Sequence, residues 1–198
     1  MIVTTTTEEV VLLDDTGQPI GTALKVGVHG PDTPLHLAFS CHVLNEFGQV
    51  LITRRALGKT TWPGVWTNSF CGHPQPAEPV RDAIHRRAEY ELGLELSDVE
   101  LALPLFRYRA TDTSGLVENE ICPVYLAICT TLPEPHPREV MDFAWVDPVA
   151  LGESIRLTPL VFSPWLVLQA RLLPFLSGSG SESLTSRLRA REEVPACA

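Results

Sequence analysis

Residues 67–74 read TNSFCGHP, and residues 78–93 read EPVRDAIHRRAEYELG. The first stretch predicts an extended segment in which Cys71 and His73 point to the same side, because side chains alternate along a strand. The second predicts a helix: Pro79 suits the first turn, where its missing N–H is not needed, and Gly93 suits a left-handed cap. Between them apolar residues repeat at helical spacing, at Val80, Ala83, Ile84 and Ala88.

Two glycines enclose charged residues at a fixed spacing along this unit: the run is Gly72, Glu78, Arg86, Glu91 and Gly93. Carboxylates and guanidiniums on a helix that follows a glycine-containing loop suit metal-bound phosphates. Arg87 and Glu91 are four residues apart and share one face, so both could reach a single diphosphate, the arginine directly and the glutamate through a metal. We infer that the substrate is a phosphorylated small molecule.

The composition limits the classes of protein to which this chain can belong. The 198 residues are 44% hydrophobic, which suits one domain with a proper core, and the net charge of -9 argues against a general nucleic-acid binder. The five cysteines are an odd set without a C-x-x-C pair, so we expect no disulfide framework, no cysteine zinc site and a reducing cytoplasm. Residues 1–10 do not resemble a secretion signal, and no segment is apolar enough to span a bilayer.

The first half of the chain predicts strands. Residues 10–13 and 20–26 form an expected hairpin around a turn at 14–19, and residues 35–44 and 50–53 form two more strands. In the strand 35–44, alternation places His36 on one face and Cys41 on the other, where we expect Cys41 to pack in the core. The aromatic loop 62–66 is expected to cap the core rather than to contact a ligand.

The second half predicts a strand at 106–110, a turn at 111–115, a longer strand at 116–128 and a short one at 143–146. Glu118 and Glu120 are two apart on the long strand, so both carboxylates face one place and favour a cation there. Prolines mark a surface loop at 133–137, and Pro164 and Trp165 begin an expected apolar helix that ends at Ala170. From about Ser177 the composition predicts a flexible tail.

A metal site is one hypothesis for the nitrogen- and oxygen-bearing side chains. Taken singly, each histidine is more often a surface or satisfied polar residue than a ligand. Together with the paired glutamates they suit manganese or zinc, with magnesium as a third option. The set is His29, His36, His73, Glu118 and Glu120.

Two further groups leave alternatives open. Cys71 is either an inert buried thiol or a proton donor or acceptor beside the metal site. Four basic residues are either a solvated surface or the local positive charge that an acidic diphosphate-binding protein needs; they are Lys25, Arg55, Lys59 and Arg87.

These residues resemble a known family. The run Gly72, Glu78, Arg86, Glu91, Gly93, Leu94 matches the Nudix box GX5EX7REUXEEXGU, and residues 68–74, 108–112 and 118–120 resemble the type 1 isopentenyl-diphosphate isomerases over about residues 10–170. The resemblance implies an α/β (α+β) Nudix fold, a mixed sheet between helices. It also implies a hairpin extension (1–28), a catalytic domain (29–170) and a tail (171–198).

The resemblance also implies roles. Cys71 and Glu120 would transfer protons in a 1,3-allylic shift between isopentenyl and dimethylallyl diphosphate, with Tyr108 near the glutamate and Trp165 against the cationic carbon. The five metal ligands would hold Mn²⁺ or Zn²⁺, Glu91 would hold Mg²⁺, and the four basic residues would bind the diphosphate. For Trp165, a packing role is an equal alternative. A cytoplasmic monomer without nucleic-acid or membrane partners is expected.

Two departures from the Nudix box bear on the reaction. Arg87 and Tyr90 stand where phosphohydrolases of this fold carry glutamates that gather magnesium, which favours gripping a diphosphate over cleaving it. Two rival hypotheses remain at this point. One is a Nudix phosphohydrolase of a nucleoside diphosphate derivative, and the other is a non-enzymatic module whose acidic cluster holds a structural ion.

Overall fold

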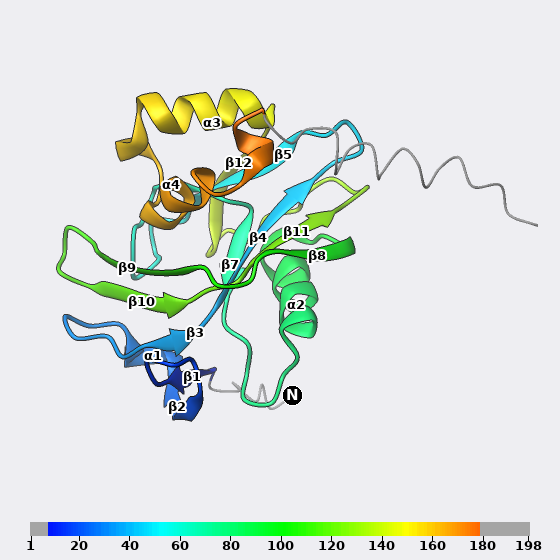
Figure 1. Cartoon of the computed structure of the whole chain (residues 1–198). Helices are drawn as coiled ribbons and strands as arrows, with labels where there is room; N and C mark the ends of the chain where they lie inside the picture. Colours follow the sequence, from blue (N-terminus) through cyan, green and yellow to red (C-terminus); the bar gives the residue numbers. More distant parts are fainter. Residues whose placement is uncertain (1–7, 179–198) are drawn as a thin grey trace, which may run out of the picture.

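The computed structural model describes residues 8–178, which fold into two mixed β-sheets with helices packed around them (Figure 1). The expectations for the first seven residues, for Cys197 and for most of the predicted tail lie outside the described residues.

The N-terminal sheet contains the expected hairpin. Asp14 closes its turn by accepting hydrogen bonds from the backbone N–H groups of Thr16 and Gln18, both 2.9 Å long. The strand order is β2-β1-β3-β10-β9, and only the β3–β10 pair is parallel. The strands are β1 (Glu9–Leu13), β2 (Pro19–Leu24), β3 (His36–Leu37), β9 (Arg107–Thr111) and β10 (Val117–Ile121).

The central sheet has the order β12-β5-β4-β11-β8, with β6 beside β5 and β7 beside β4. Here β4 and β11 are parallel neighbours. The strands are β4 (Phe39–Leu44), β5 (Val50–Arg55), β6 (Trp66–Thr67), β7 (Phe70–Gly72), β8 (Ser97–Leu103), β11 (Val124–Ile128) and β12 (Val140–Val146).

Two long strands expected from the sequence are each split between the sheets, which corrects the prediction. The segment 35–44 becomes β3 and β4, and the segment 116–128 becomes β10 and β11. Pro123 has no N–H to donate to a ladder, and the chain leaves the N-terminal sheet there. The two segments run next to each other where they pass from one sheet to the other. Two hydrogen bonds join them there, from Ala38 N to Ile121 O and from Ser40 N to Pro123 O, each 3.0 Å long. The crossing places the polar residues of β3 and β10 at the junction of the sheets.

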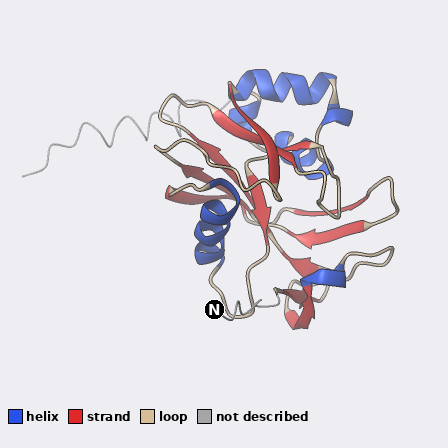
Figure 2. Ribbon diagram, turned by 180° about the vertical axis from the view of Figure 1, so that it is seen from behind, coloured by secondary structure: helices blue, strands red, loops and turns tan. Residues whose placement is uncertain are grey.

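Helices cover both faces of the central sheet, which confirms the expected Nudix architecture (Figure 2). One core cluster packs β4 residues Phe39, Cys41 and Val43 against α2 (Val80–Leu92). The other packs Ala38, Val50 and their neighbours against α3 (Pro148–Leu157) and α4 (Pro164–Ala170). The expectations that Cys41 belongs to the core and that the tryptophan loop caps it are confirmed.

The helix predicted for 78–92 is α2. It begins after Pro79 and ends at Gly93, whose φ of 63° is the expected left-handed cap and whose N–H donates to Glu89 O. A single irregular turn, α1 (Lys25–Val28), follows the hairpin, and Gly27 provides its positive φ of 139°.

The sequence prediction missed β8 and α3. A recognisable signal was present for α3, since the Asp147 side chain accepts a hydrogen bond from Ala150 N at 2.8 Å and Pro148 fills the first turn. The predicted tail boundary at 171 was placed too early. Leu173, Phe175 and Leu176 are buried around the short helix η2 (Pro174–Leu176), which follows η1 (Pro159–Val161) and α4. These residues pack against the domain because the burial of their apolar side chains is favourable.

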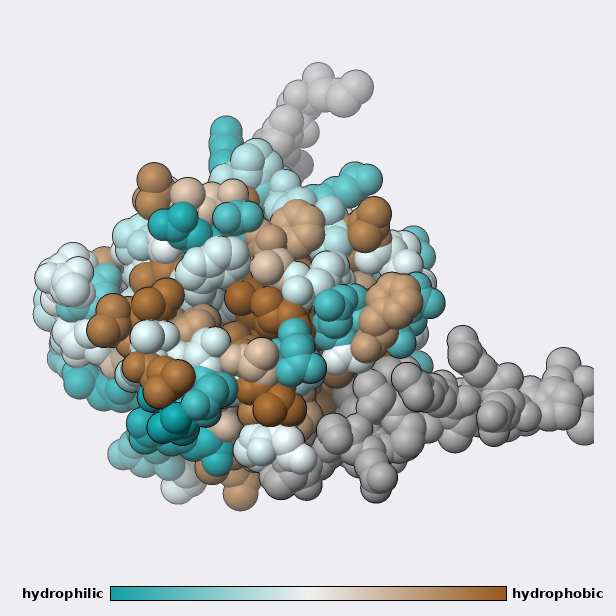
Figure 3. Space-filling model, turned by 90° about the horizontal axis from the view of Figure 1, so that it is seen from above, coloured by the Kyte–Doolittle hydropathy of each residue, from teal (hydrophilic) through white to brown (hydrophobic). Residues whose placement is uncertain are grey.

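Among residues 8–178, no helix combines the length and the apolar character that a membrane span requires. Viewed from above, the face over α3 and α4 mixes apolar and polar side chains (Figure 3). Its exposed apolar residues include Val149, Leu157, Leu160 and Leu168. Apolar residues scattered among polar ones are ordinary for a protein surface.

Candidate active site and metal centre

A cavity of about 550 Å³ lies where the two sheets meet. Most of the residues singled out in the sequence line it, although they come from seven different segments. Those lining it are Lys25, His29, Arg55, Lys59, Cys71, His73, Arg87, Tyr108, Glu118, Glu120 and Trp165. His36 and Glu91 are buried beside the cavity rather than among its lining residues.

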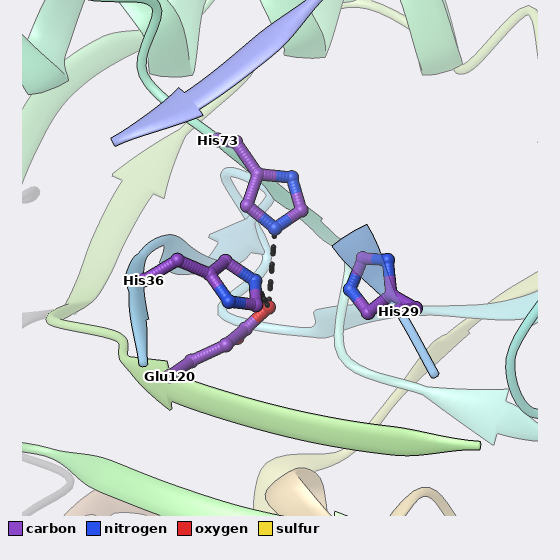
Figure 4. A group of neighbouring side chains, drawn as sticks. All are labelled: His29, His36, His73 and Glu120. Carbon is purple, nitrogen blue, oxygen red and sulfur yellow. Dashed lines mark hydrogen bonds and ion pairs between the residues drawn. The ribbon is translucent and has the colours of Figure 1, made fainter. Parts of the chain in front are cut away.

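Three imidazoles converge on one carboxylate at the inner end of the site (Figure 4). His29 follows α1, His36 lies on β3, His73 follows β7, and Glu120 lies directly opposite His36 on β10. Their ligand atoms all lie within 4.8 Å of one another. Glu120 Oε1 is 3.2 Å from His73 Nε2 and 3.5 Å from His36 Nε2.

The chemistry of this group fits a divalent cation. His36 Nδ1 is 2.9 Å from Pro34 O, which can only accept, so Nδ1 carries a proton; in the neutral imidazole that ligates a metal, Nε2 then turns its lone pair toward Glu120. Nε2 of His36 and Nε2 of His29 are buried without a hydrogen-bond partner. Buried lone pairs that face a carboxylate are unfavourable unless a positive ion lies between them.

Glu118 takes a different place from the other expected ligands. Its Oε1 accepts a hydrogen bond from Thr61 Oγ1 at 2.7 Å, and its Oε2 lies 2.8 Å from His29 Nε2 outside hydrogen-bonding geometry. It therefore touches the cluster at His29 but is not among the four residues whose ligand atoms are mutually close.

The electrostatics of the cluster favour an ionised Glu120. Burial alone would raise the pKa of its carboxyl, but the adjacent His36 and His73 outweigh burial and hold this pKa well below its usual range. Burial also lowers the pKa of His73 to about 4, which keeps that imidazole neutral and able to ligate a metal.

Cys71 lies at the edge of the cavity in β7 and is half-buried. Its Sγ is 3.3 Å from Ser40 Oγ and donates to Asn68 Oδ1 at 3.4 Å. Burial raises the pKa of the thiol to about 12, which outweighs the opposing contact with Ser40. The group is therefore a neutral thiol that carries a proton.

Two aromatic rings line the same cavity as the thiol and the carboxylate. Strand pairing sets Tyr108 directly opposite Glu120, and burial raises the pKa of its phenol well above the usual value. The Trp165 ring is 5.8 Å from the Tyr108 ring and 5.5 Å from that of Trp62. Trp165 is only 2% exposed, so it is part of the core and of the cavity wall at once.

The four basic residues line the cavity, and three of them lie beside carboxylates that sequence reasoning did not single out. Lys25 pairs with Glu8 at 2.5 Å, and Lys59 pairs with Glu139. Arg87 lies 3.4 Å from Glu139 and 3.6 Å from Glu8. Glu8 lies near the start of the described chain and Glu139 just before β12, so no local motif connects them with the site.

Arg87 and Arg55 are also anchored by neighbours. Arg87 binds Glu91 Oε1 through Nε at 2.9 Å and through a terminal nitrogen at 2.5 Å, so the two expected phosphate-site residues bind each other. The Arg87 guanidinium lies 5.0 Å from the centre of the Tyr90 ring. The two residues that depart from the Nudix box are therefore in contact with each other. Arg55 donates to the backbone oxygen of Thr61 at 2.8 Å.

The remaining Nudix-box residues have structural contacts. Arg86 forms a two-bond pair with Glu78, each bond 2.7 Å long, and donates to His73 O at 3.2 Å. A Cβ atom at Gly72 would lie 2.8 Å from Arg87 Cγ and 2.9 Å from the Phe39 ring. The box thus fixes the loop that carries His73 and brings β7 against α2.

Comparisons with known proteins agree with this architecture. A model of the NUDIX domain matches residues 34–166. An isopentenyl-diphosphate Delta-isomerase of Agromyces mediolanus is 67% identical over 171 residues, which cover 86% of this chain and 83% of that protein. One of Clavibacter michiganensis subsp. michiganensis is 58% identical over 190 residues, covering 96% and 97%.

A crystal structure of a protein from Deinococcus radiodurans matches with a TM-score of 0.64 at 21% identity and covers 83% of this chain and 98% of that one. That likeness concerns the fold alone. The family match and the closely similar sequences together carry the assignment. The chain belongs to the NUDIX family and, within it, to the isopentenyl-diphosphate Delta-isomerases.

Proposed function

We propose that this protein interconverts isopentenyl diphosphate and dimethylallyl diphosphate by adding one proton and removing another. The observation that carries the proposal is that the Cys71 thiol and the Glu120 carboxylate line the same cavity as four cationic side chains. One group carries a proton and the other is ionised, as a proton shift between two carbons of one substrate requires.

The substrate's diphosphate is bound in this proposal by Lys25, Arg55, Lys59 and Arg87, which leaves the hydrocarbon end to enter the cavity. Guanidinium and ammonium groups offer several donors to phosphate oxygens. Burial opposes the charged form of Arg87, but Glu91 and Glu139 outweigh burial and hold its pKa above its usual value. The Arg87 guanidinium therefore stays charged although it is buried.

The reaction proceeds in two proton transfers. The terminal alkene carbon takes the proton of Cys71, so the S–H bond breaks, a C–H bond forms and a tertiary cation remains beside a thiolate. The Glu120 carboxylate then removes a proton from the neighbouring methylene carbon, and the electrons of that C–H bond form the new double bond. Exchange with solvent resets both groups, and the reverse reaction uses the same residues with their roles exchanged.

The cation must be protected from water while it exists. The indole of Trp165 and the phenol of Tyr108 form an apolar wall with electron-rich faces, which stabilises a cation by up to about 2 kcal/mol per ring when desolvated. The phenol also stays protonated because of its burial.

We infer that His29, His36, His73 and Glu120 hold Mn²⁺ or Zn²⁺, with Glu118 completing or supporting the site. The bound ion would supply positive charge that fixes the carboxylate in place and tunes its proton affinity. Glu91 is proposed to hold Mg²⁺ with the diphosphate, which requires it to exchange part of its contact with Arg87. A cytoplasmic monomer without nucleic-acid partners completes the proposal, and size-exclusion chromatography tests the oligomeric state.

Two variants test the catalytic assignment. Cys71→Ala removes the proton donor and Glu120→Gln removes the base with little change in volume, so each should lower kcat by about 10³-fold or more. Conversion is measured by NMR of the two isomers, with thermal unfolding as the control for folding. Near-normal turnover in either folded variant would refute that residue's role.

The phosphohydrolase alternative predicts another product. Arg87 and Tyr90, which pack on one another, replace two carboxylates that would gather magnesium at a scissile phosphate. We therefore expect no phosphate release from a panel of nucleoside diphosphate derivatives. If the wild type releases phosphate and does not isomerise, the hydrolase is correct. If it does neither but binds a metal, the non-enzymatic module is supported.

A further inference from the structure

Asn68 lies in the loop between β6 and β7 and is completely buried. It takes no part in the proton transfers described above, yet both the oxygen and the nitrogen of its side-chain amide form several hydrogen bonds. The oxygen Oδ1 accepts from Trp165 Nε1 at 2.9 Å, from Thr67 Oγ1 at 2.9 Å and from Cys71 Sγ at 3.4 Å. The nitrogen Nδ2 donates to Phe70 O at 2.8 Å and to Cys41 O and Ser40 Oγ at 3.0 Å.

The orientation of this amide is fixed by the chemistry of its partners. The indole N–H of Trp165 can only donate, so it must face the amide oxygen. The backbone oxygens of Cys41 and Phe70 can only accept, so they must face the amide nitrogen. A flipped amide would oppose like groups at all three contacts, at a cost that buried polar groups do not tolerate.

One oxygen atom is therefore shared by two groups proposed to act on the substrate. Cys71 lies on β7 and Trp165 on α4, and the two residues line the same cavity without a hydrogen bond between them among the described contacts. A second path runs through Ser40, whose hydroxyl accepts from Asn68 and lies 3.3 Å from Cys71 Sγ. The Cys71 thiol and the Ser40 hydroxyl beside it are thus both hydrogen-bonded to the amide of Asn68.

We propose that Asn68 is a positioning residue that holds the sulfur of Cys71 and the indole of Trp165 at a fixed spacing. This inference rests on the proposed isomerisation and adds to it the reason why the proton donor and the cation-facing ring stay aligned. Proton transfer to carbon depends strongly on the approach of donor and acceptor. Among the described hydrogen bonds, none joins this amide to the four cations proposed to bind the diphosphate, although one of them, Arg55, lies 5.4 Å from the Trp165 ring. Loss of Asn68 should therefore affect the chemical step and leave substrate binding largely intact.

The chain offers a matched control in the next residue. Ser69 is also completely buried in the same loop, where it donates to Leu51 O at 2.7 Å and accepts from Val43 N at 2.7 Å. It is not among the residues that line the cavity. Ser69→Ala thus loses buried hydrogen bonds and stability without touching Cys71 or Trp165.

The test compares kcat and KM for isopentenyl diphosphate in Asn68→Ala and Ser69→Ala, together with their melting temperatures. Asn68→Ala should lower kcat by about 10- to 100-fold with KM within about three-fold of the wild type, and Ser69→Ala should retain kcat. Equal losses of kcat in both variants, or a loss confined to KM, would overturn the positioning role.

A second variant keeps the test decisive if Asn68→Ala does not fold. Thr67→Val keeps the shape of the side chain and removes one of the hydrogen bonds to the Asn68 oxygen; its own hydroxyl otherwise contacts only Ser163 Oγ among the described hydrogen bonds. It should lower kcat by about three-fold or more at unchanged KM and shift the ¹⁵N resonance of the Trp165 indole N–H. Unchanged kcat and an unchanged resonance would contradict the proposal. A wild type that does not isomerise would instead refute the proposed function, and the resonance reports on Asn68 in either case.

Discussion

At the scale of single residues, the interior contains a polar network behind the cavity that carries no full charge. His42 is completely buried, and its Nε2 lies 2.9 Å from Gln169 Oε1, which Ser40 also approaches at 3.4 Å. Burial lowers the pKa of His42 to about 4, because the charged imidazole would lose its hydration there. The neutral imidazole is the state that this network accommodates.

His42 should therefore make stability depend on pH. In the unfolded chain its pKa is 6.5 and in the folded chain about 4, so below 6.5 the unfolded state binds more protons and stability falls as pH falls. From pH 7 to pH 5 the free energy of unfolding of the wild type should decrease by about 2 kcal/mol more than that of His42→Gln. Urea unfolding at both pH values measures this difference. The exposed His85, changed to Gln, is the control, and parallel pH curves for the wild type and His42→Gln would contradict the assignment.

At the scale of elements, the contact between β7 and α2 decides where Arg87, which is proposed to bind the diphosphate, lies. Gly72 is required at this contact by space, not by its backbone angles, since a Cβ there would meet Arg87 and Phe39 at less than 3.0 Å. The glycine of the Nudix box therefore lets the helix approach the strand and places Arg87 at the cavity.

Gly72→Ala should accordingly affect stability and substrate binding together. Overpacking at this contact should cost about 1–3 kcal/mol of unfolding free energy, and displacement of Arg87 should raise KM. Gly58→Ala is the control, because a Cβ there meets no atom within 4 Å and the residue does not need a positive φ. Denaturant unfolding and steady-state kinetics check both effects. A Gly72→Ala protein as stable as Gly58→Ala would show that the contact yields without strain.

The elements also show what sequence reasoning can and cannot provide. The helix 78–92 and the hairpin were predictable because capping, turn residues and apolar spacing are local signals. The split of 35–44 and 116–128 between two sheets was not, because the alternation of side chains continues through both crossings and only strand pairing distinguishes the sheets. Side-chain chemistry and the family resemblance pointed to His36 and Glu120, but Glu8, Glu139 and Asn68 became part of the site only through contacts distant in sequence.

At the scale of the whole molecule, the proposed metal-binding group brings together residues from both sheets. His36 and Glu120 belong to the N-terminal sheet, His73 follows a strand of the central sheet, and His29 follows the hairpin. An ion bound by all four would hold the two sheets together at the cavity.

Metal removal should therefore lower both stability and activity. Adding Mn²⁺ or Zn²⁺ to chelator-treated protein should stabilise it by about 2.7 kcal/mol at a hundredfold excess over Kd, visible as a higher melting temperature. His36→Gln should abolish this metal-dependent shift, whereas the exposed His85→Gln should retain it. Identical melting curves with and without metal would contradict the site.

The central claim is that one cavity adds a proton to a carbon atom and removes another while the diphosphate stays intact. It is tested most directly by incubating the wild type with isopentenyl diphosphate in heavy water and following the products by ²H and ³¹P NMR. The account predicts deuterium at the new methyl group of dimethylallyl diphosphate and no free phosphate. Release of phosphate without isomerisation, or isomerisation with no deuterium from solvent, would contradict it.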